Sequence, residues 1–559
     1  MESPTLEQSN SKKQYDEPSN SFAQDAKLAT DKEQSMTLMQ GIRLYPKAIG
    51  WSIVISTCIA MEGYDLCLLG NFYGFPQFNE KFGELGPDGT YQVPARWQAG
   101  LSNAANCGEI IGLFINGLVA ERFGYKNTML ACLISMIGLI FIPVFATSGS
   151  LIQLLFYYLI AGIPWGIWQT LTITYASEVC PIALRGYLTT YVNFCWGIGQ
   201  VIGVGVIKSQ LNNKTEWAYR LPWALQWMWL PFLITGVALA PESPWLLVRK
   251  GRMEDARKNL LRLTSLNRET GFDADETLAM MAHTTAMEAQ MTTGSSYKQC
   301  FTGINRRRTE IVCMVWAIQN LAGNSFTGYS NYFLQQGGLP ASSALSFVLG
   351  QYGINCVGVF GAWALMSWGF GRRSLYLYGQ CGLCVMLCIM GCMYFVRDKH
   401  PEAAALATGG MMLGWATVYQ LTVGTICYSI VGEIPSRQLL VKTIALGRNA
   451  YNVVGIVCSV LTPYMVNPTA WNWQQLTAFF WAGICFCCIV YTFFRIPETK
   501  GRSFAELDLL FEHRVSARRF ASTDLDVFDT TEAKAAARAV EMGEDKDLPV
   551  HVEKTARVC

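Results

Sequence analysis

The chain has 559 residues, of which 51% are hydrophobic and only 15% are charged, and its mean hydropathy is positive. Apolar residues at this density are typical of an integral membrane protein and argue against a soluble enzyme of this size. The net charge of +2 does not predict an orientation, because orientation depends on where Lys and Arg lie relative to the membrane spans.

Apolar windows of about twenty residues, the length that crosses a bilayer, recur between about residue 48 and residue 495. We count roughly twelve such spans. Lys and Arg fall in alternate breaks between them, as in residues 121–126, residues 249–308 and the tail that begins at Arg495. This alternation predicts that both termini are cytoplasmic.

Three motifs of the first half recur in the same order in the second half. ERFGYK (121–126) corresponds to WGFGRRS (368–374), SEVCPIALRG (177–186) to GEIPSRQLLVKT (432–443), and PESPWLLVRKGR (241–252) to PETKGRSFAELD (497–508). An ordered repeat of this kind predicts two six-helix halves, as in transporters whose halves rock about a site at mid-membrane.

The repeat and the spans divide the chain into five parts. We expect a disordered cytoplasmic tail over residues 1–46, a six-helix bundle over 47–240, a cytoplasmic linker with short helices over 241–308, a second six-helix bundle over 309–496 and a cytoplasmic tail over 497–559. The first forty residues lack the apolar core of a signal peptide.

Several function classes have no motif in the sequence. No phosphate-cradling loop or nucleophile elbow occurs, so we expect neither an ATP-driven pump nor an enzyme. The 19 Cys lie mostly inside apolar spans without metal-ligand spacing, so we expect neither disulfides nor a metal site. The single glycosylation sequon, at Asn213, predicts that its loop faces outward.

The repeated motifs resemble those of the major facilitator superfamily and, within it, of the sugar porters. The finer pattern of MEGYDLCLLGNFYGFPQFNEKFG (61–83), GIPWGIWQTLTITYASEVCPIALRG (162–186) and RNAYNVVGIV (448–457) is similar to the fungal alpha-glucoside (maltose-type) permeases. The resemblance implies an all-α major facilitator fold of twelve transmembrane helices, and a monomer that imports a sugar such as maltose with protons across the plasma membrane. It implies no cofactor and no nucleic acid.

Four charged residues within the spans are candidates for proton coupling. Glu62 and Asp65 lie three apart, so they are expected to share a helix face. Glu109 lies in the second span and Arg448 in the eleventh. A charge at the centre of a span costs roughly 2.5 to 3.5 kcal/mol on insertion scales, so these acids predict a water-filled cavity or a cationic partner. The alternative is that each charge lies near a helix end and reaches the headgroups.

The resemblance assigns roles to these charges. It implies that Asp65 is the proton acceptor, but the Arg that usually pairs with this acid is replaced here by Tyr158. Our hypothesis is that Arg448 takes over the role of counter-charge, with Glu62 or Glu109 as its partner.

Amides and tryptophans in four spans are candidates for sugar binding, because sugar hydroxyls need donors and acceptors and an apolar face for stacking. The candidates are Trp165, Gln169, Gln200, Gln319, Asn320, Asn324, Ser325, Asn449 and Asn452. The resemblance carries over Gln200, Gln319 and Asn320 and, with a change of residue, Ser325. For any single amide the alternative is a hydrogen bond that joins two helices. In the tenth span, Tyr428 departs from the pattern of hexose carriers, which leaves room for a larger substrate.

Charged residues at the predicted cytoplasmic helix ends form a further group. They are Arg122, Glu178, Arg185, Glu242, Arg372, Arg373, Glu433, Arg437 and Glu498. The resemblance implies an ion-pair latch that holds the two halves together in the outward-open state and breaks when the interior opens. The alternative is that they only anchor the helices at the headgroups.

Two other functions remain open at this point. A sugar sensor on the same fold would signal without transport, although such sensors tend to have longer cytoplasmic tails. A facilitative hexose uniporter would carry sugar without protons, and Glu62 and Arg448 argue against it.

Overall fold

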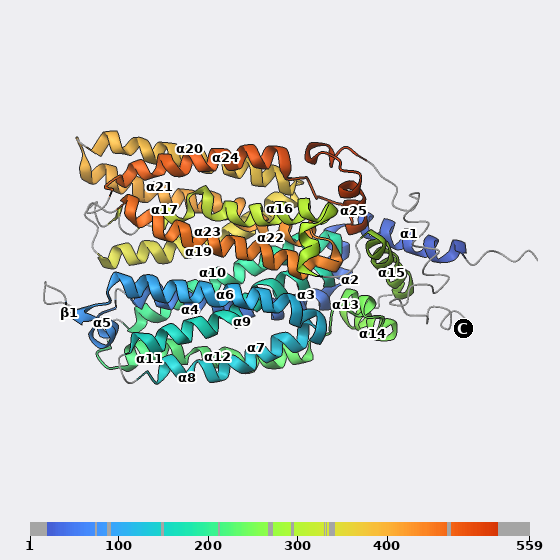
Figure 1. Cartoon of the computed structure of the whole chain (residues 1–559), viewed down its shortest axis with the longest axis horizontal. Helices are drawn as coiled ribbons and strands as arrows, with labels where there is room; N and C mark the ends of the chain where they lie inside the picture. Colours follow the sequence, from blue (N-terminus) through green and yellow to red (C-terminus); the bar gives the residue numbers. More distant parts are fainter. Residues whose placement is uncertain are drawn as a thin grey trace, which may run out of the picture.

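A computed structural model describes residues 19–72, 75–85, 91–146, 150–210, 213–265, 272–291, 296–328, 330, 333–334, 341–397, 399–466 and 471–523. In this part of the chain, long helices form two groups that lie side by side, and short helices gather at one end (Figure 1). The two groups correspond to the first and second halves of the sequence.

Helices of the first half make six successive passes. They are α3 (Pro46–Ser56) with α4 (Cys58–Phe72), α6 (Ala95–Phe123), α7 (Tyr125–Leu139) with α8 (Phe141–Val144), α9 (Leu151–Val179), α10 (Ile182–Gln210), and α11 (Trp217–Ala224) with α12 (Gln226–Leu239). Each joined pair is separated by a single residue, so both members belong to one pass.

Helices of the second half repeat this arrangement. They are α16 (Gly303–Gln319) with the π-helical η3 (Asn320–Asn324) and α17 (Ser325–Thr327), α19 (Ala341–Ser367), α20 (Arg372–Arg397), α21 (Pro401–Leu421) with α22 (Val423–Glu433), α23 (Leu440–Val466) and α24 (Thr477–Arg495). Eight described helical segments are long and apolar enough to cross a membrane. By this criterion of length and composition eight segments qualify, whereas the described helices of the two halves together make twelve passes. The number of passes agrees with the twelve spans predicted.

The two ends of the bundle carry different short elements. At one end lie α5 (Pro76–Phe82) and the antiparallel strands β1 (Glu84–Leu85) and β2 (Tyr91–Gln92). At the other end lie α13 (Pro244–Arg249), α14 (Met253–Leu263), α15 (Ala274–Met291) and α25 (Phe504–Glu512) (Figure 1). We call the second end the linker end, because α13, α14 and α15 connect the two halves. Short 3-10 turns complete the described elements: η2 (Tyr297–Phe301), η4 (Arg437–Leu439), η5 (Gln474–Leu476) and η6 (Ala517–Arg519).

The N-terminal tail differs from the disorder expected for residues 1–46. From Ser19 onward it is described as α1 (Ser19–Ser35) and α2 (Leu38–Leu44), whereas residues 1–18 and 524–559 lie outside the described part. Thr37 and Gln40 form a capping box that starts α2. Helix α1 packs on α15 and buries Ala26 there. The order thus comes from a tertiary partner, which the polar composition of the tail does not indicate.

Small residues bring α6 and α9 into backbone contact. A Cβ on Gly108 or Gly112 would lie 2.1 Å from the carbonyl oxygen of Leu159 or Ile163, respectively. Only glycine permits so close an approach. The contact places Glu109, between the two glycines, next to the helix that carries Gln169.

Candidate functional site

Two acids and one arginine approach each other where the halves meet. Glu62 on α4 and Glu109 on α6 belong to the first half, and Arg448 on α23 belongs to the second. Their side chains are buried, with 0%, 3% and 8% of their surface exposed, respectively. The structure therefore brings together three of the four residues predicted to act in proton coupling.

The carboxamide of Gln169 lies between the acid and the arginine. Its Nε2 donates to Glu62 Oε1 at 2.6 Å, and its Oε1 accepts from Arg448 Nε at 2.7 Å. A second amide, Asn452 on α23, donates to Glu109 Oε2 at 3.0 Å. Neutral amides thus connect the charged groups of the two halves.

Aromatic rings cover the guanidinium of Arg448. Its central carbon lies 4.1 Å from the ring centroid of Tyr451 and 4.7 Å from that of Trp316. Aromatic faces attract a cation most strongly where water is excluded, so these rings stabilise the buried charge. Sequence reasoning misses Trp316, and its position one helical turn before Gln319 is the feature that could have indicated it.

A small internal cavity lies beside the charged groups. It is lined by Ile59, Glu62, Gln169, Val192, Trp196, Trp316, Tyr428 and Arg448, which come from both halves. Its volume is about 10 Å³, roughly the room that one water molecule needs. A sugar does not fit into this volume, so its binding here requires helices of the two halves to move apart.

Asp65 faces surroundings different from those of Glu62, although both acids lie on α4. The fully buried Asp65 carboxylate accepts a hydrogen bond from the Tyr157 hydroxyl of α9, and Trp223 and Gln226 lie beside it. An offset of three residues rotates two side chains by about 60° around a helix. Here that rotation is enough for Glu62 to face the second half while Asp65 points into the first. The structure does not bring Asp65 to the group formed by Glu62, Glu109 and Arg448.

The neighbour of the residue that replaces the usual Arg supplies the hydrogen bond to Asp65. Tyr158 packs its ring against Tyr157, with centroids 5.0 Å apart, and Tyr157 supplies the hydroxyl that Asp65 accepts. The partner of this acid is therefore a neutral donor in place of a cation.

The amides predicted to bind sugar fall into separate groups. Gln169 and Asn452 bond the charged side chains at the interface of the halves. Gln319 accepts from the Tyr419 hydroxyl at 3.0 Å, and Asn320 donates to the Tyr451 carbonyl oxygen at 3.0 Å, so these two amides join helices within the second half.

Other predicted sugar ligands keep polar atoms without a partner. Both side-chain polar atoms of Asn449 and Oε1 of Gln200 are buried and lack a hydrogen-bond partner among the described residues. A buried polar group without a partner costs about 1 to 3 kcal/mol, which a sugar hydroxyl would recover. Asn324 and Ser325 are half-buried at the end of the π-helical turn, and Trp165 is fully buried in the first half.

Glu178, at the end of α9, is the centre of a polar network at the linker end. Its carboxylate accepts from Arg249 Nη1 at 3.0 Å, from the Tyr125 hydroxyl at 3.2 Å and from the Ser243 hydroxyl. Ser243 and Arg249 belong to the PESPWLLVRKGR motif. The motif therefore supplies two of these three partners of the acid, and Tyr125 comes from ERFGYK. Of these four residues, only Glu178 was predicted to act here.

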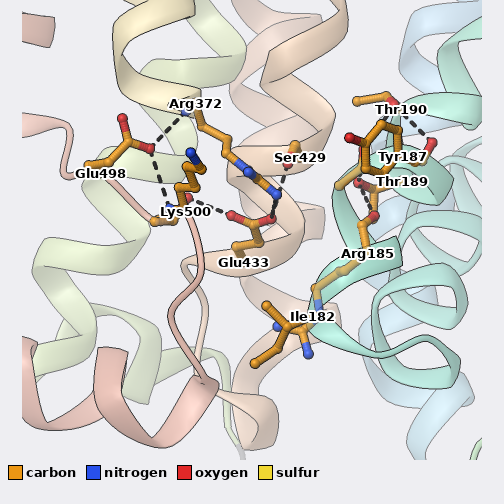
Figure 2. A network of polar contacts seen from close by, with 12 residues as sticks. Ile182, Arg185, Tyr187, Thr189, Thr190, Arg372, Ser429, Glu433, Glu498 and Lys500 are labelled. Atoms are coloured by element: carbon orange, nitrogen blue, oxygen red, sulfur yellow. Dashed lines mark hydrogen bonds and ion pairs between the residues drawn. The ribbon is translucent and has the colours of Figure 1, made fainter. Parts of the chain in front are cut away.

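Glu433, at the end of α22, occupies the corresponding place in the second half (Figure 2). It accepts from Arg372 Nη2 at 3.3 Å, from the Ser429 hydroxyl at 3.1 Å and from the Thr499 hydroxyl at 2.5 Å. Thr499 follows the Pro–Glu pair of its motif as Ser243 does in the first half. The repeated motifs thus place the same kind of donor on the same kind of acid.

The two motif acids bind the starts of helices. Glu242 accepts from the backbone N–H groups of Tyr125 at 3.2 Å and Lys126 at 3.3 Å, at the start of α7. Glu498 accepts from the backbone N–H of Arg372 at 2.8 Å, at the start of α20. Burial raises the pKa of Glu242, and the N–H donors oppose that rise. An acid at such a position accepts hydrogen bonds from the first N–H groups of the helix, and its negative charge interacts favourably with the helix dipole.

Arg437 joins the two halves at the linker end. This residue of the second half donates from Nη2 to the Ser177 carbonyl oxygen at 3.1 Å, and its Nη1 lies 3.9 Å from Glu178 Oε1. The Phe504 ring of α25 lies 3.2 Å from the guanidinium of Arg437 and 3.7 Å from that of Arg185. The aromatic ring therefore links one arginine of each half.

Arg185 has an acidic partner that the sequence does not indicate. Glu33 of α1 lies 3.7 Å from Arg185 Nη2 and accepts from the Ile182 backbone N–H at 2.9 Å. In Figure 2, Arg185 and Ile182 lie on α10, beside the contacts of Glu433. Glu33 belongs to the tail that was expected to be disordered, so no sequence pattern identifies it.

Two other predicted latch residues contact different groups. The Arg122 guanidinium lies 5.7 Å from the ring of its neighbour Phe123, and Arg373 donates to the Phe493 carbonyl oxygen at 2.8 Å. These contacts lie within one half each. Arg122 and Arg373 therefore do not join the network around Glu178 and Glu433.

Comparison with known proteins identifies the family. The chain matches the family described as sugar (and other) transporters over residues 51–511. The chain belongs to the sugar transporter family. A general alpha-glucoside permease of Saccharomyces cerevisiae is 40% identical over 508 residues, which are 90% of this chain and 82% of the permease. A maltose permease of the same species is 39% identical over 529 residues, which are 94% and 85%, respectively.

Solved structures show a similar fold. The proton:xylose symporter XylE bound to 6-bromo-6-deoxy-D-glucose matches with a TM-score of 0.70 at 20% identity, covering 84% of this chain and 99% of that one. Inward-open XylE from E. coli matches with a TM-score of 0.59 at 18% identity, covering 83% and 99%. This sugar transporter is thus a multi-pass membrane protein with the major facilitator fold, and the family and fold predicted from the motifs are confirmed.

Proposed function

We propose that this sugar transporter imports an alpha-glucoside disaccharide, such as maltose, together with protons across the plasma membrane by alternating access. Its relatives named above are an alpha-glucoside permease and a maltose permease. One structural observation carries the coupling: Glu62 and Glu109 lie buried at the interface of the halves, next to Arg448 of the other half. Buried acids that face a protein interior are typical of proton relays in transporters.

Proton entry would supply enough free energy to concentrate the sugar. One elementary charge that moves inward through 100 mV contributes about 2.3 kcal/mol. Because each 1.4 kcal/mol corresponds to a factor of ten, this contribution alone supports roughly fiftyfold accumulation.

The test uses cells that express the chain and lack sugar uptake of their own. Labelled maltose, sucrose, trehalose and glucose are added one at a time while the pH of the medium is recorded. We expect uptake of at least one alpha-glucoside to make the medium more alkaline. Uptake of glucose without a pH change would indicate a facilitative uniporter, and binding without uptake would indicate a sensor; either result would contradict the proposal.

We further infer that the linker end and both termini face the cytoplasm, so that Asn213 faces outward. Asn213 lies between α10 and α11, and the adjacent loop residue Glu216 pairs with Lys81 of α5 at 3.2 Å, at the end opposite the linker end (Figure 1). N213Q is expected to remove one glycan and lower the apparent mass on a gel, as T215A should also do. A wild-type mass that does not change after endoglycosidase treatment would contradict glycosylation at Asn213.

A further inference from the structure

The orientation of the Gln169 carboxamide follows from its two neighbours. Arg448 Nε carries a hydrogen and donates only, so the atom that faces it at 2.7 Å must be the carbonyl oxygen. The NH2 group then donates to Glu62 Oε1 at 2.6 Å. The hydrogen bonds therefore run in one direction, from Arg448 through Gln169 to Glu62.

This chain of hydrogen bonds crosses the interface between the halves. Gln169 and Glu62 belong to the first half and Arg448 to the second. No carboxylate of the described residues lies within 4.0 Å of an Arg448 nitrogen. A direct buried ion pair at this place would have to break whenever the halves separate, and breaking such a pair is strongly unfavourable.

We propose that Gln169 is a positioning residue that holds Arg448 and Glu62 one carboxamide apart, so that each charge acts on the other without a direct ion pair. The inference rests on the proposed function, because it assigns a role within proton-coupled transport. Protonation of Glu62 removes the negative charge at the end of the chain of hydrogen bonds, which weakens the bonds that join Gln169 and Arg448 across the interface.

Other titratable groups near Glu62 belong to the same environment. They are Glu109 of α6, Tyr428 of α22, and Arg448 and Tyr451 of α23. Arg448 is the basic group among them. Gln169 lies beside both acids, so removal of its side chain lets Arg448 approach them.

Two substitutions of Gln169 are expected to shift the pH dependence of transport in opposite directions. Q169A removes the spacer and lets Arg448 approach Glu62, which favours the ionised acid. Half-maximal uptake then requires a lower pH, by about one unit, which is a tenfold higher proton concentration. In Q169E the new carboxylate pairs with Arg448, so Glu62 loses its cationic neighbour and its protonated form is favoured. Half-maximal uptake then moves to a higher pH.

The measurement is the initial rate of labelled maltose uptake by proteoliposomes as a function of external pH. Q380A is the matched control, because Gln380 is a buried glutamine whose amide bonds Thr492 of the same half at 3.0 Å. We expect Q380A to keep the wild-type pH profile even if it lowers the melting temperature. A shift shared by Q380A would assign the effect to lost packing and overturn the inference.

The outcomes separate this inference from the proposed function. Opposite shifts for Q169A and Q169E support it. Wild-type profiles for both variants, or shifts in the same direction, overturn it while the wild-type protein still couples maltose to protons. If Q169A does not reach the membrane, the direction of the Q169E shift decides. Wild-type uptake that moves no protons at any pH would reject the proposed function itself.

Discussion

Replacing Glu62 with Gln is expected to abolish the accumulation of maltose against its gradient while exchange of maltose across the membrane continues. Gln has nearly the same shape as Glu, and its side-chain oxygen still accepts from Gln169, but it cannot bind or release a proton. The ratio of internal to external maltose is therefore expected to fall from as much as roughly fiftyfold to about one. Labelled maltose in energised cells measures accumulation, and proteoliposomes loaded with unlabelled maltose measure exchange.

Two further variants test this assignment. Glu84 is an exposed acid that pairs with Arg96 at 2.9 Å, so E84Q is expected to accumulate maltose like the wild type. D65N tests the acid that the structure separates from Arg448. If E62Q and D65N both still concentrate maltose, the assignment of coupling to these acids is wrong.

Replacing Arg437 with Gln is expected to favour opening of the linker end. The substitution removes a charged donor to the Ser177 carbonyl oxygen and the cation on the Phe504 ring. A hydrogen bond to a charged group contributes about 1.5 to 3 kcal/mol, so the open population is expected to rise at least about tenfold. Hydrogen–deuterium exchange should become faster for the backbone amides at the ends of α9 and α22.

Arg373 of the second half provides the control for this experiment. Arg373 follows the network residue Arg372 in the sequence but donates to the Phe493 carbonyl oxygen within its own half. R373Q is therefore expected to leave exchange at the ends of α9 and α22 unchanged. A large loss of maltose affinity in R437Q, with unchanged amide exchange, would show that Arg437 does not act as a latch.

The fold and several polar contacts at the linker end could be predicted from the sequence where the information is local. Spans follow from runs of apolar residues, and the repeated motifs place acids at helix ends by chain connectivity alone. Glu242 and Glu498 illustrate this, because each is connected by a short segment to the helix that precedes it and binds the start of another helix in the same half. The hydroxyl donors Ser243 and Thr499 belong to the same motifs, although no role was predicted for them.

The orientation of the intramembrane acids could not be predicted in the same way. A spacing of three residues places Glu62 and Asp65 near one face, but the surrounding helices decide what each acid contacts. The Tyr157 hydroxyl bonds Asp65 and the Gln169 carboxamide bonds Glu62, and both residues come from α9. Sequence spacing carries no information about how α9 is rotated against α4.

The contacts of Gln169 and of the N-terminal tail also depend on the tertiary structure, so the sequence alone does not predict them. Gln169 was expected to bind sugar because amides line sugar sites, and in the structure it hydrogen-bonds Glu62 and Arg448. Glu33 lies in a polar tail, and its contacts with Ile182 and Arg185 exist only because α1 packs on the linker end. Each of these contacts joins residues that lie more than a hundred positions apart in the chain.

The most direct test of the central claim is the internal pH of proteoliposomes that contain the wild-type protein and a trapped pH-sensitive dye. Maltose is added outside with no proton gradient and no membrane potential, and an ionophore for K⁺ prevents charge from building up. The account predicts that maltose entering down its own gradient draws protons inward, so that the interior becomes acidic and E62Q abolishes this change. Entry of labelled maltose at a constant internal pH would contradict the account.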